Sequence, residues 1–167
     1  MRLWIPALAI LVGVLAGCAS VRLVDGSYVV RRKGYRVGAP AGWTRLASEA
    51  DLALRQPQLD AGLLANATCE GKIPRRPLPV LVRHLRFGLR EVRDLVEAPV
   101  ELGGLAGRAS RFRATLDGAP VAVQAVTLAG PRCVYDLVLV APPETMAAAS
   151  AGFAELTAGF AVAGGAP

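Results

Sequence analysis

The chain has 167 residues and a net charge of +6, and 53% of its residues are hydrophobic but only 5% are aromatic. This composition excludes an intrinsically disordered chain, and the length suits a single domain with a core of aliphatic side chains. One histidine and three cysteines leave little material for histidine-based catalysis or a metal centre, and we expect no cofactor and no bound metal.

The N-terminus has the pattern of an export signal. Arg2 precedes an apolar run from 3 to 15, and the small residues Ala16 and Gly17 follow it. A charged start, an apolar middle and small residues at a cleavage point define a secretory signal peptide. The alternative is an uncleaved membrane anchor. Against it, the run is shorter than the roughly 20 residues that a spanning helix needs, and Pro6 interrupts it.

The segment Leu15-Ala16-Gly17-Cys18 resembles the lipobox of bacterial lipoproteins. The resemblance implies cleavage after Gly17 and a diacylglycerol on Cys18, so residues 1–17 would be a signal peptide and residues 18–27 a lipidated tether. In Gram-negative families an aspartate after the cysteine retains a lipoprotein in the inner membrane, and here Ala19 stands in that place. The resemblance therefore predicts an outer-membrane lipoprotein that faces the periplasm and is attached to the membrane through its lipid.

A hairpin is predicted next. The strand-like segments 28–30 and 35–37 flank the basic turn Arg31-Arg32-Lys33-Gly34, which glycine closes. The cations of this turn can contact lipid headgroups, or they can simply lie in a solvated loop. A turn at Pro40 and Gly42 follows, after which Trp43 is interpreted as an anchor in the core.

Two more strands are predicted over 51–55 and 61–68, and Cys69 ends the second one. A helix is then predicted over 78–93, because apolar residues recur at steps of three and four and make one stripe. The stripe consists of Leu78, Leu81, Val82, Leu85, Leu89 and Val92.

Four arginines lie off this predicted helical stripe, namely Arg83, Arg86, Arg90 and Arg93. On one helix they would form a basic face that can attract an anionic surface, by about 1 kcal/mol for each residue. The alternative is that they are ordinary solvated side chains. His84 lies among them and is interpreted as a partly exposed helix residue, not as a catalytic group.

The second half predicts an antiparallel meander. Strands are expected over 94–101, 108–116, 121–128 and 133–140, separated by turns at Gly103-Gly104, Asp117-Gly118 and Gly130-Pro131. The last of these strands is the most apolar, so it should be central and covered on both faces. After Pro142-Pro143, a helix is predicted from the spacing of Met146, Ala149, Phe153, Leu156 and Phe160.

A disulfide is predicted between Cys69 and Cys133. If Cys18 carries a lipid, these are the two cysteines left in an exported domain, where oxidation is favoured. Cys69 ends one strand and Cys133 begins another after a turn, so both can lie at the same edge of a sheet. The alternative is two buried free thiols that act as small apolar residues.

The segment Tyr35-x-Val37-x-x-Pro40-x-Gly42-Trp43, with a mid-chain helix, long meander strands and a terminal helix, is similar to the PsbP/DcrB-like family. The resemblance implies an α/β (α+β) fold: an α/β/α sandwich in which a mid-chain helix and a C-terminal helix cover a curved antiparallel sheet. The domain would span residues 28–161 and be followed by a tail, 162–167. Further segments look like small bacterial lipoproteins of unknown function: Leu102-Gly103-Gly104, Leu116-Asp117-Gly118 and Cys133-Val134-Tyr135-Asp136-Leu137.

No catalytic residue carries over from these families, and the sequence has no hydrolytic triad, ligand-spaced metal cluster or phosphate-binding loop. The hypothesis is a non-catalytic envelope lipoprotein that binds or scaffolds an unknown envelope protein or cell-wall partner. No nucleic acid is expected as a partner of an exported chain without a recognition motif. The alternative is a carrier of a small apolar ligand or lipid, with a pocket between sheet and helix. Such a pocket would be lined by Leu63, Leu81, Leu85 and Phe112, which equally well make an ordinary core.

Overall fold

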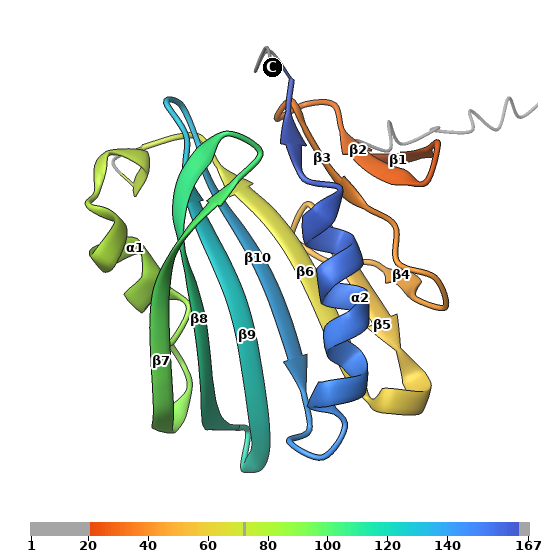
Figure 1. Cartoon of the computed structure of the whole chain (residues 1–167), viewed down its shortest axis with the longest axis vertical. Coiled ribbons are helices and arrows are strands. Elements are labelled where there is room, and N and C mark those ends of the chain that lie inside the picture. The colour runs from red at the N-terminus through yellow and green to blue at the C-terminus, as the bar shows by residue number, and fades with distance from the viewer. Residues whose placement is uncertain (1–20, 72, 164–167) are drawn as a thin grey trace, which may run out of the picture.

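The computed structural model describes residues 21–71 and 73–163. Its centre is a seven-stranded antiparallel sheet in the order β4-β5-β6-β10-β9-β8-β7, and a smaller sheet has the order β1-β2-β3-β11. The strands are β1 Val21–Val24, β2 Ser27–Val30, β3 Tyr35–Gly38, β4 Thr44–Leu46, β5 Leu52–Gln56, β6 Ala61–Thr68, β7 Arg90–Leu102, β8 Leu105–Leu116, β9 Ala119–Ala129, β10 Val134–Ala141 and β11 Ala161–Val162. Figure 1 shows the large sheet curving between helices α1 (Leu78–His84) and α2 (Met146–Ala158).

Contacts of the two helices show the layers. Helix α1 contacts β8 and β9, whereas α2 contacts β10, β6 and β9 from the side that carries the main core. The large sheet therefore has one helix on each face, as the α/β/α prediction requires. Two 3₁₀ turns, Pro57–Leu59 and Ile73–Arg75, complete the described elements.

The domain begins earlier and ends later than predicted. Residues 21–24, expected in the tether, form β1 and pair with β2. The hairpin between them turns at Asp25-Gly26, where both residues have positive φ angles of 46° and 71°. Asp-Gly is a strong signal for such two-residue turns. At the other end, Val162 pairs with Tyr35 as part of β11, so the predicted tail begins too early. Cys18 and residues 1–17 lie outside the described residues.

The predicted helix over 78–93 is wrong in its second half. Helix α1 ends at His84, and β7 begins at Arg90. Between them the backbone makes tight i→i−3 turns, and Gly88 has a φ of +83°, which no helix allows. The apolar pattern continues through the turn because Leu89 packs against the cluster that contains Phe112. Val92, the last residue of the predicted stripe, is 38% exposed.

The predicted meander is confirmed. β7, β8, β9 and β10 pair in succession, and β10 then pairs with β6, which makes β10 the central strand of the large sheet. In β8, Phe112 and Ala114 are buried whereas Arg111 and Arg113 are exposed, the alternation of a strand with one covered face. The most apolar predicted strand is therefore the central one. Helix α2 covers one of its faces, whereas α1 lies over β8 and β9, so cover on both faces is only partly realised.

The main core lies between the large sheet, α2 and the small sheet. On α2, the buried residues are Ala149, Gly152, Phe153 and Leu156. The C-terminal end of α2 touches β3 so closely that a Cβ on Gly38 would lie 2.1 Å from the carbonyl oxygen of Glu155. Trp43 is half-buried and packs against this core, with its indole over Gly152. Trp43 therefore packs on the outside of α2 at the edge of the core, and not in the centre of the core as an anchor.

Candidate functional site: a basic groove beside the disulfide

Five separated segments of the chain meet at one end of the molecule. Because the strands are antiparallel, the end of β6, the turns β2–β3 and β7–β8, and the β9–β10 turn with the start of β10 all lie there, together with β11 (Figure 1). They surround a groove of about 890 Å³, here called the basic groove. Its lining comes from residues 31–34, 66–70, 103–105, 131–133 and 162–163, with Tyr135.

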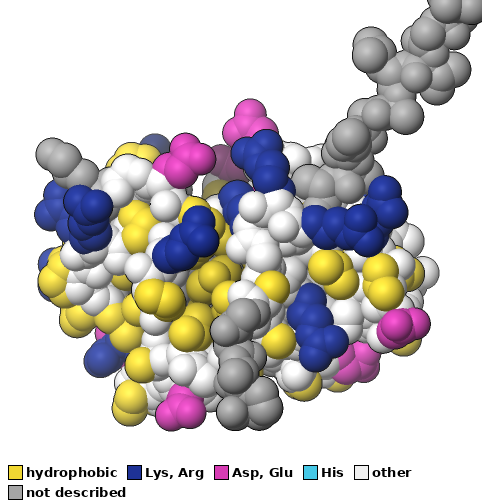
Figure 2. All heavy atoms as spheres, turned by 90° about the horizontal axis from the view of Figure 1, so that it is seen from above, with side chains coloured by type: hydrophobic (Ala, Val, Ile, Leu, Met, Phe, Trp, Pro, Cys, Tyr) yellow, Lys and Arg dark blue, Asp and Glu magenta, His cyan; other side chains and the backbone are white. Residues whose placement is uncertain are grey.

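The charge of the basic groove is mostly positive. Arg31, Arg32 and Arg132 are exposed, and in the described part of the chain none of the three has an ion-pair partner. Glu70 is the acidic residue in the lining. Figure 2 looks onto this end of the molecule and shows Lys and Arg side chains among hydrophobic ones. The groove is thus suited to bind an anion by charge.

Lys33, the third cation of the basic turn, binds groups within the protein. Its Nζ lies 2.8 Å from Oδ1 of Asp51 and also donates to the carbonyl of Ala67. The other carboxylate oxygen of Asp51 accepts hydrogen bonds from the Tyr35 hydroxyl at 2.9 Å and the Ala67 amide at 2.8 Å. Asp51 therefore ties the basic turn and β3 of the small sheet to β6 of the large one.

This network also affects Tyr35, which is only 2% exposed. Burial, followed by the charge of Asp51 and the hydrogen bond to it, raises the pKa of the Tyr35 hydroxyl far above its ordinary value. The phenol therefore stays protonated and acts as a fixed hydrogen-bond donor. Its ring packs against those of Tyr135 and Phe160, with centroids 5.3 Å and 6.4 Å away, so an aromatic cluster lies beneath the groove.

Cys69 and Cys133 are joined as a disulfide in the structure, with an S–S distance of 2.07 Å and a Cα–Cα distance of 4.0 Å. The register of β6 and β10 explains the pairing. Thr68 lies opposite Val134, so the next residue on each side brings the two cysteines opposite each other. The bond fixes the loop that carries Arg132, whose charge partly offsets the rise that burial causes in the pKa of Tyr135.

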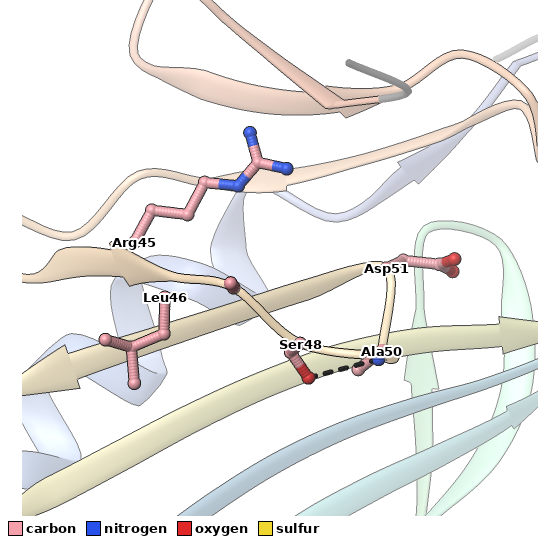
Figure 3. Close-up of a pocket in the computed structure, with 6 residues that line it drawn as sticks. Arg45, Leu46, Ser48, Ala50 and Asp51 are labelled. Atoms are coloured by element: carbon pink, nitrogen blue, oxygen red, sulfur yellow. Dashed lines mark hydrogen bonds between the residues drawn. The ribbon is translucent and has the colours of Figure 1, made fainter. Parts of the chain in front are cut away.

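A second, smaller hollow of about 400 Å³ lies in the loop between β4 and β5 (Figure 3). Its polar groups do not converge on a common point. Arg45 extends toward the small sheet and donates to the Val21 carbonyl at 3.2 Å, whereas Asp51 points away from the loop. Ser48 accepts a hydrogen bond from the Ala50 amide at 3.1 Å. Because these groups already bond within the chain, the hollow is not a candidate binding site.

The structure separates the four arginines that were predicted to share a helix. Arg83 lies on α1, Arg86 in the turn after it, and Arg90 and Arg93 in β7. Arg86 is 3.6 Å from Glu97, which also accepts from Nε of Arg108 at 3.2 Å. The premise of one helical face is wrong, because the helix ends before Arg86. Contact of these arginines with an anionic surface stays a prediction.

His84 is partly exposed, as expected, and lies near Asp136 on the α1 side of the sheet. Burial raises the pKa of Asp136. The hydrogen bond from Thr127 at 2.8 Å and the charge of His84 lower it in part. Across the described residues, no group of three or more His, Cys, Asp or Glu side chains is placed to hold a metal. None of the helices described here is long and apolar enough to cross a membrane.

The four residues proposed for an apolar pocket do not share one. Leu63 belongs to the main core on the α2 face, whereas Phe112 belongs to the small cluster on the opposite face. Leu81, buried on α1, is on that opposite face as well. Because the sheet separates Leu63 from Phe112, these side chains form two parts of the interior and not the wall of one cavity.

Two important residues, Arg132 in the lining of the groove and Asp51 beside it, are not found by reasoning from the sequence. Asp51 is interpreted there only as the start of a strand, and no local pattern indicates that it binds a lysine 18 positions earlier in the chain. Arg132 lies between Pro131 and Cys133. The predicted disulfide to Cys69 places Arg132 beside the end of β6, so for this residue the sequence does contain a signal.

Comparison with known proteins shows similarity in structure alone. No family model matches the sequence, and no curated protein matches it. LpqN of Mycobacterium tuberculosis has a TM-score of 0.62 at 14% identity, over 77% of this chain and 83% of that one. The cyanobacterial PsbP of Synechocystis has a TM-score of 0.57 at 15% identity, over 88% of this chain and 95% of that one. The chain therefore has a PsbP-like fold, a curved antiparallel sheet with helices packed on it.

Proposed function

We propose that the chain is a non-catalytic lipoprotein of the bacterial cell envelope, anchored through Cys18 at the periplasmic face of the outer membrane, where it binds or scaffolds another envelope component. The observation that carries the proposal is the lipobox-like segment Leu15–Cys18, which ends only three residues before β1. A folded domain thus begins immediately after the residue that would carry the lipid.

Two further observations support this proposal. A disulfide is typical of domains that fold outside the cytoplasm, and Cys69 and Cys133 are paired in this way. The fold is shared with LpqN, a protein involved in cell envelope biogenesis in Mycobacterium tuberculosis. Because the two sequences are only 14% identical, the shared fold supports a location in the cell envelope but does not indicate a shared partner.

The proposal assigns no reaction to the chain because its most buried carboxylates form ion pairs and hydrogen bonds within the fold. Asp51 binds Lys33, Glu97 binds two arginines, and Asp136 accepts from Thr127. In the parts of the chain that the structure describes, every buried side-chain nitrogen or oxygen has a hydrogen-bond partner. A binding role is favoured by Phe87, which is 93% exposed in the turn after α1.

The anchor is tested by intact-mass measurement of the protein isolated from membranes of a bacterial host. We expect a chain that begins at Cys18 and carries a diacylglycerol, and we expect Cys18→Ala to yield either uncleaved precursor or protein without lipid. Cys69→Ala serves as the matched control, because it removes another cysteine and should leave the lipid in place. A mature wild-type chain that starts elsewhere and lacks lipid would contradict the proposal.

The binding role is tested by crosslinking in cells. Benzoylphenylalanine in place of Phe87 preserves an exposed aromatic side chain on the α1 side, and the same probe at Leu46, 47% exposed on edge strand β4, is the matched control. We expect a discrete adduct from position 87 that is absent from position 46. Equal adducts from both positions, or none from either, would argue against a specific partner on the α1 side.

A further inference from the structure

We propose that the basic groove is the surface by which the domain lies on its membrane, with Arg31, Arg32 and Arg132 binding the phosphate groups of anionic phospholipids. The inference rests on the proposed lipid anchor and adds to it the orientation of the domain. It assigns the membrane contact to this groove and not to the arginines at positions 83–93.

The length of chain before the domain limits which surface can reach the bilayer. Three residue steps separate Cys18 from Val21, and an extended chain spans at most about 3.6 Å for each step, or about 11 Å in all. Val21 pairs with Val30, and Val30 immediately precedes Arg31. A lipid on Cys18 would therefore hold the basic turn at the bilayer surface.

The start of β1 is also held in the fold, so β1 does not detach from its sheet and lengthen the connection to the lipid. Val21 is only 2% exposed, and its carbonyl accepts a hydrogen bond from Arg45 at 3.2 Å. The opposite end of the large sheet lies a strand length away, about 25 Å for the eight residues of β10. That end is beyond the reach of a three-residue connection.

The positive charge of the groove suits a membrane surface that contains anionic phospholipids. Arg31, Arg32 and Arg132 are exposed and free of ion pairs within residues 21–71 and 73–163, whereas Glu70 is the acidic residue of the lining. The arginine side chain presents parallel donors that match the geometry of a phosphate. Anionic lipids attract such residues within a Debye length of the surface, and salt weakens the attraction.

The two loops that carry these arginines are fixed relative to each other. The ion pair between Lys33 and Asp51 holds the β2–β3 turn against β6. The disulfide between Cys69 and Cys133 holds the β9–β10 loop against the same strand end. The three guanidinium groups are therefore presented on a rigid frame, so binding a headgroup orders little additional chain.

The surface is tested with a chain that begins at Ala19 and so lacks the lipid. This chain retains residues 21–163, which contain both sheets, both helices and the whole described core, and it is expected to fold on its own. The probe is sedimentation with vesicles of phosphatidylglycerol mixed into phosphatidylcholine, compared with pure phosphatidylcholine. One variant combines Arg31→Gln, Arg32→Gln and Arg132→Gln. Its matched control combines Arg83→Gln, Arg90→Gln and Arg93→Gln, three other exposed arginines.

We expect the groove variant to bind anionic vesicles about 100-fold more weakly and the control variant at most about threefold more weakly. Since both variants lose the same charge, the difference reports position alone. Equal losses, a larger loss in the control variant or equal binding to pure phosphatidylcholine would overturn the inference. If thermal unfolding shows the groove variant to be unfolded, Arg132→Gln alone is compared with Arg83→Gln, with about fivefold weaker binding expected for the former only.

Two more measurements distinguish a membrane contact from the binding of a free anion and test the orientation of the domain. In the first, soluble glycerol phosphate is added and amide exchange in the groove is measured. Slower exchange with glycerol phosphate, together with no binding to anionic vesicles, would assign the groove to a free anion and overturn the membrane contact. On the lipidated protein in the same vesicles, amide exchange should slow at residues 31–34 and 132–133 but not at 83–93, and the reverse pattern would overturn the orientation. The sedimentation assay needs no lipid on Cys18, so failure of the anchor itself appears only in the intact mass.

Discussion

The two faces of the large sheet are filled in different ways. On the α2 face, Leu137, Leu139 and Leu156 have no exposed surface and belong to a core that extends into the small sheet. On the α1 face, the buried apolar cluster contains only Phe112, Ala114, Val121 and Val123. One face therefore carries most of the hydrophobic stabilisation, and the other is covered by a helix of two turns.

Polar cross-strand bonds occupy much of what remains of the α1 face. Arg108 of β8 binds Glu97 of β7, and Thr127 of β9 donates to Asp136 of β10. Beyond them, Phe87 is 93% exposed in the turn after α1. The comparison indicates that the α1 face can change its sequence, or contact another molecule, at less cost to the fold than the α2 face.

The largest expected effect concerns the disulfide, which lies on the α2 face because Cys133 is buried in the main core. Replacing both Cys69 and Cys133 by alanine should lower the free energy of unfolding by about 4 kcal/mol, since the bond closes a loop with a sequence separation of 64. Chemical denaturation measures the loss, and wild-type protein with its disulfide reduced is the control. If reduction leaves the unfolding free energy unchanged, the bond does not contribute to the difference between the faces.

The next effect tests the close contact between α2 and β3. In Gly38→Ala the new methyl group would meet the Glu155 carbonyl, which belongs to the helix backbone and cannot move alone, so we expect a loss of about 3 kcal/mol. Gly62→Ala is the matched control, because this strand glycine has its nearest neighbour, the Leu54 carbonyl, at 3.9 Å. Thermal unfolding of both variants compares them. A mild effect at position 38 would mean that α2 can shift, so that its face is less rigid than the contacts suggest.

Much of this fold could be predicted from the sequence because its signals are local. The alternation around Phe112 and the Asp117-Gly118 turn identify the meander, and the spacing of Phe153 and Leu156 identifies α2. The end of α1 was missed because the periodic apolar residues continue through the turn at Gly88 into β7. A helix and a chain that lies along one face of a sheet can bury the same residues, so periodicity alone did not separate them.

The groove could be predicted only in part. The basic turn at 31–34 and the pairing of Cys69 with Cys133 follow from composition and compartment. The alignment of Val21 with Val30 follows from the two-residue turn at Asp25-Gly26, a local signal that the prediction did not use. The bond between Lys33 and Asp51 depends on how the two sheets pack against each other, which no local pattern gives.

The smallest expected effect concerns Asp136, which is half-buried on the α1 face. Burial raises the pKa of this carboxyl above its ordinary value of 3.8, and the bond from Thr127 and the charge of His84 offset only part of the rise. A folded state with a raised carboxyl pKa binds the proton more tightly than the unfolded chain does. The contribution of Asp136 to stability is therefore most favourable below pH 3.8, declines as the pH rises through the raised pKa and is constant above it.

Asp136→Asn removes the buried charge and keeps an oxygen that can accept from Thr127. At neutral pH we expect the free energy of unfolding to rise by about 0.5–2 kcal/mol, the range of single stabilising substitutions. The gain should shrink as the pH falls toward 4, because the wild-type carboxyl is then protonated. Denaturation at several pH values measures this dependence, with Glu49→Gln, a carboxyl in an exposed loop, as the control for net charge. A loss of stability at neutral pH would show that the Asp136 charge is satisfied in the folded protein, and that the α1 face is a better-organised interior than its small apolar cluster indicates.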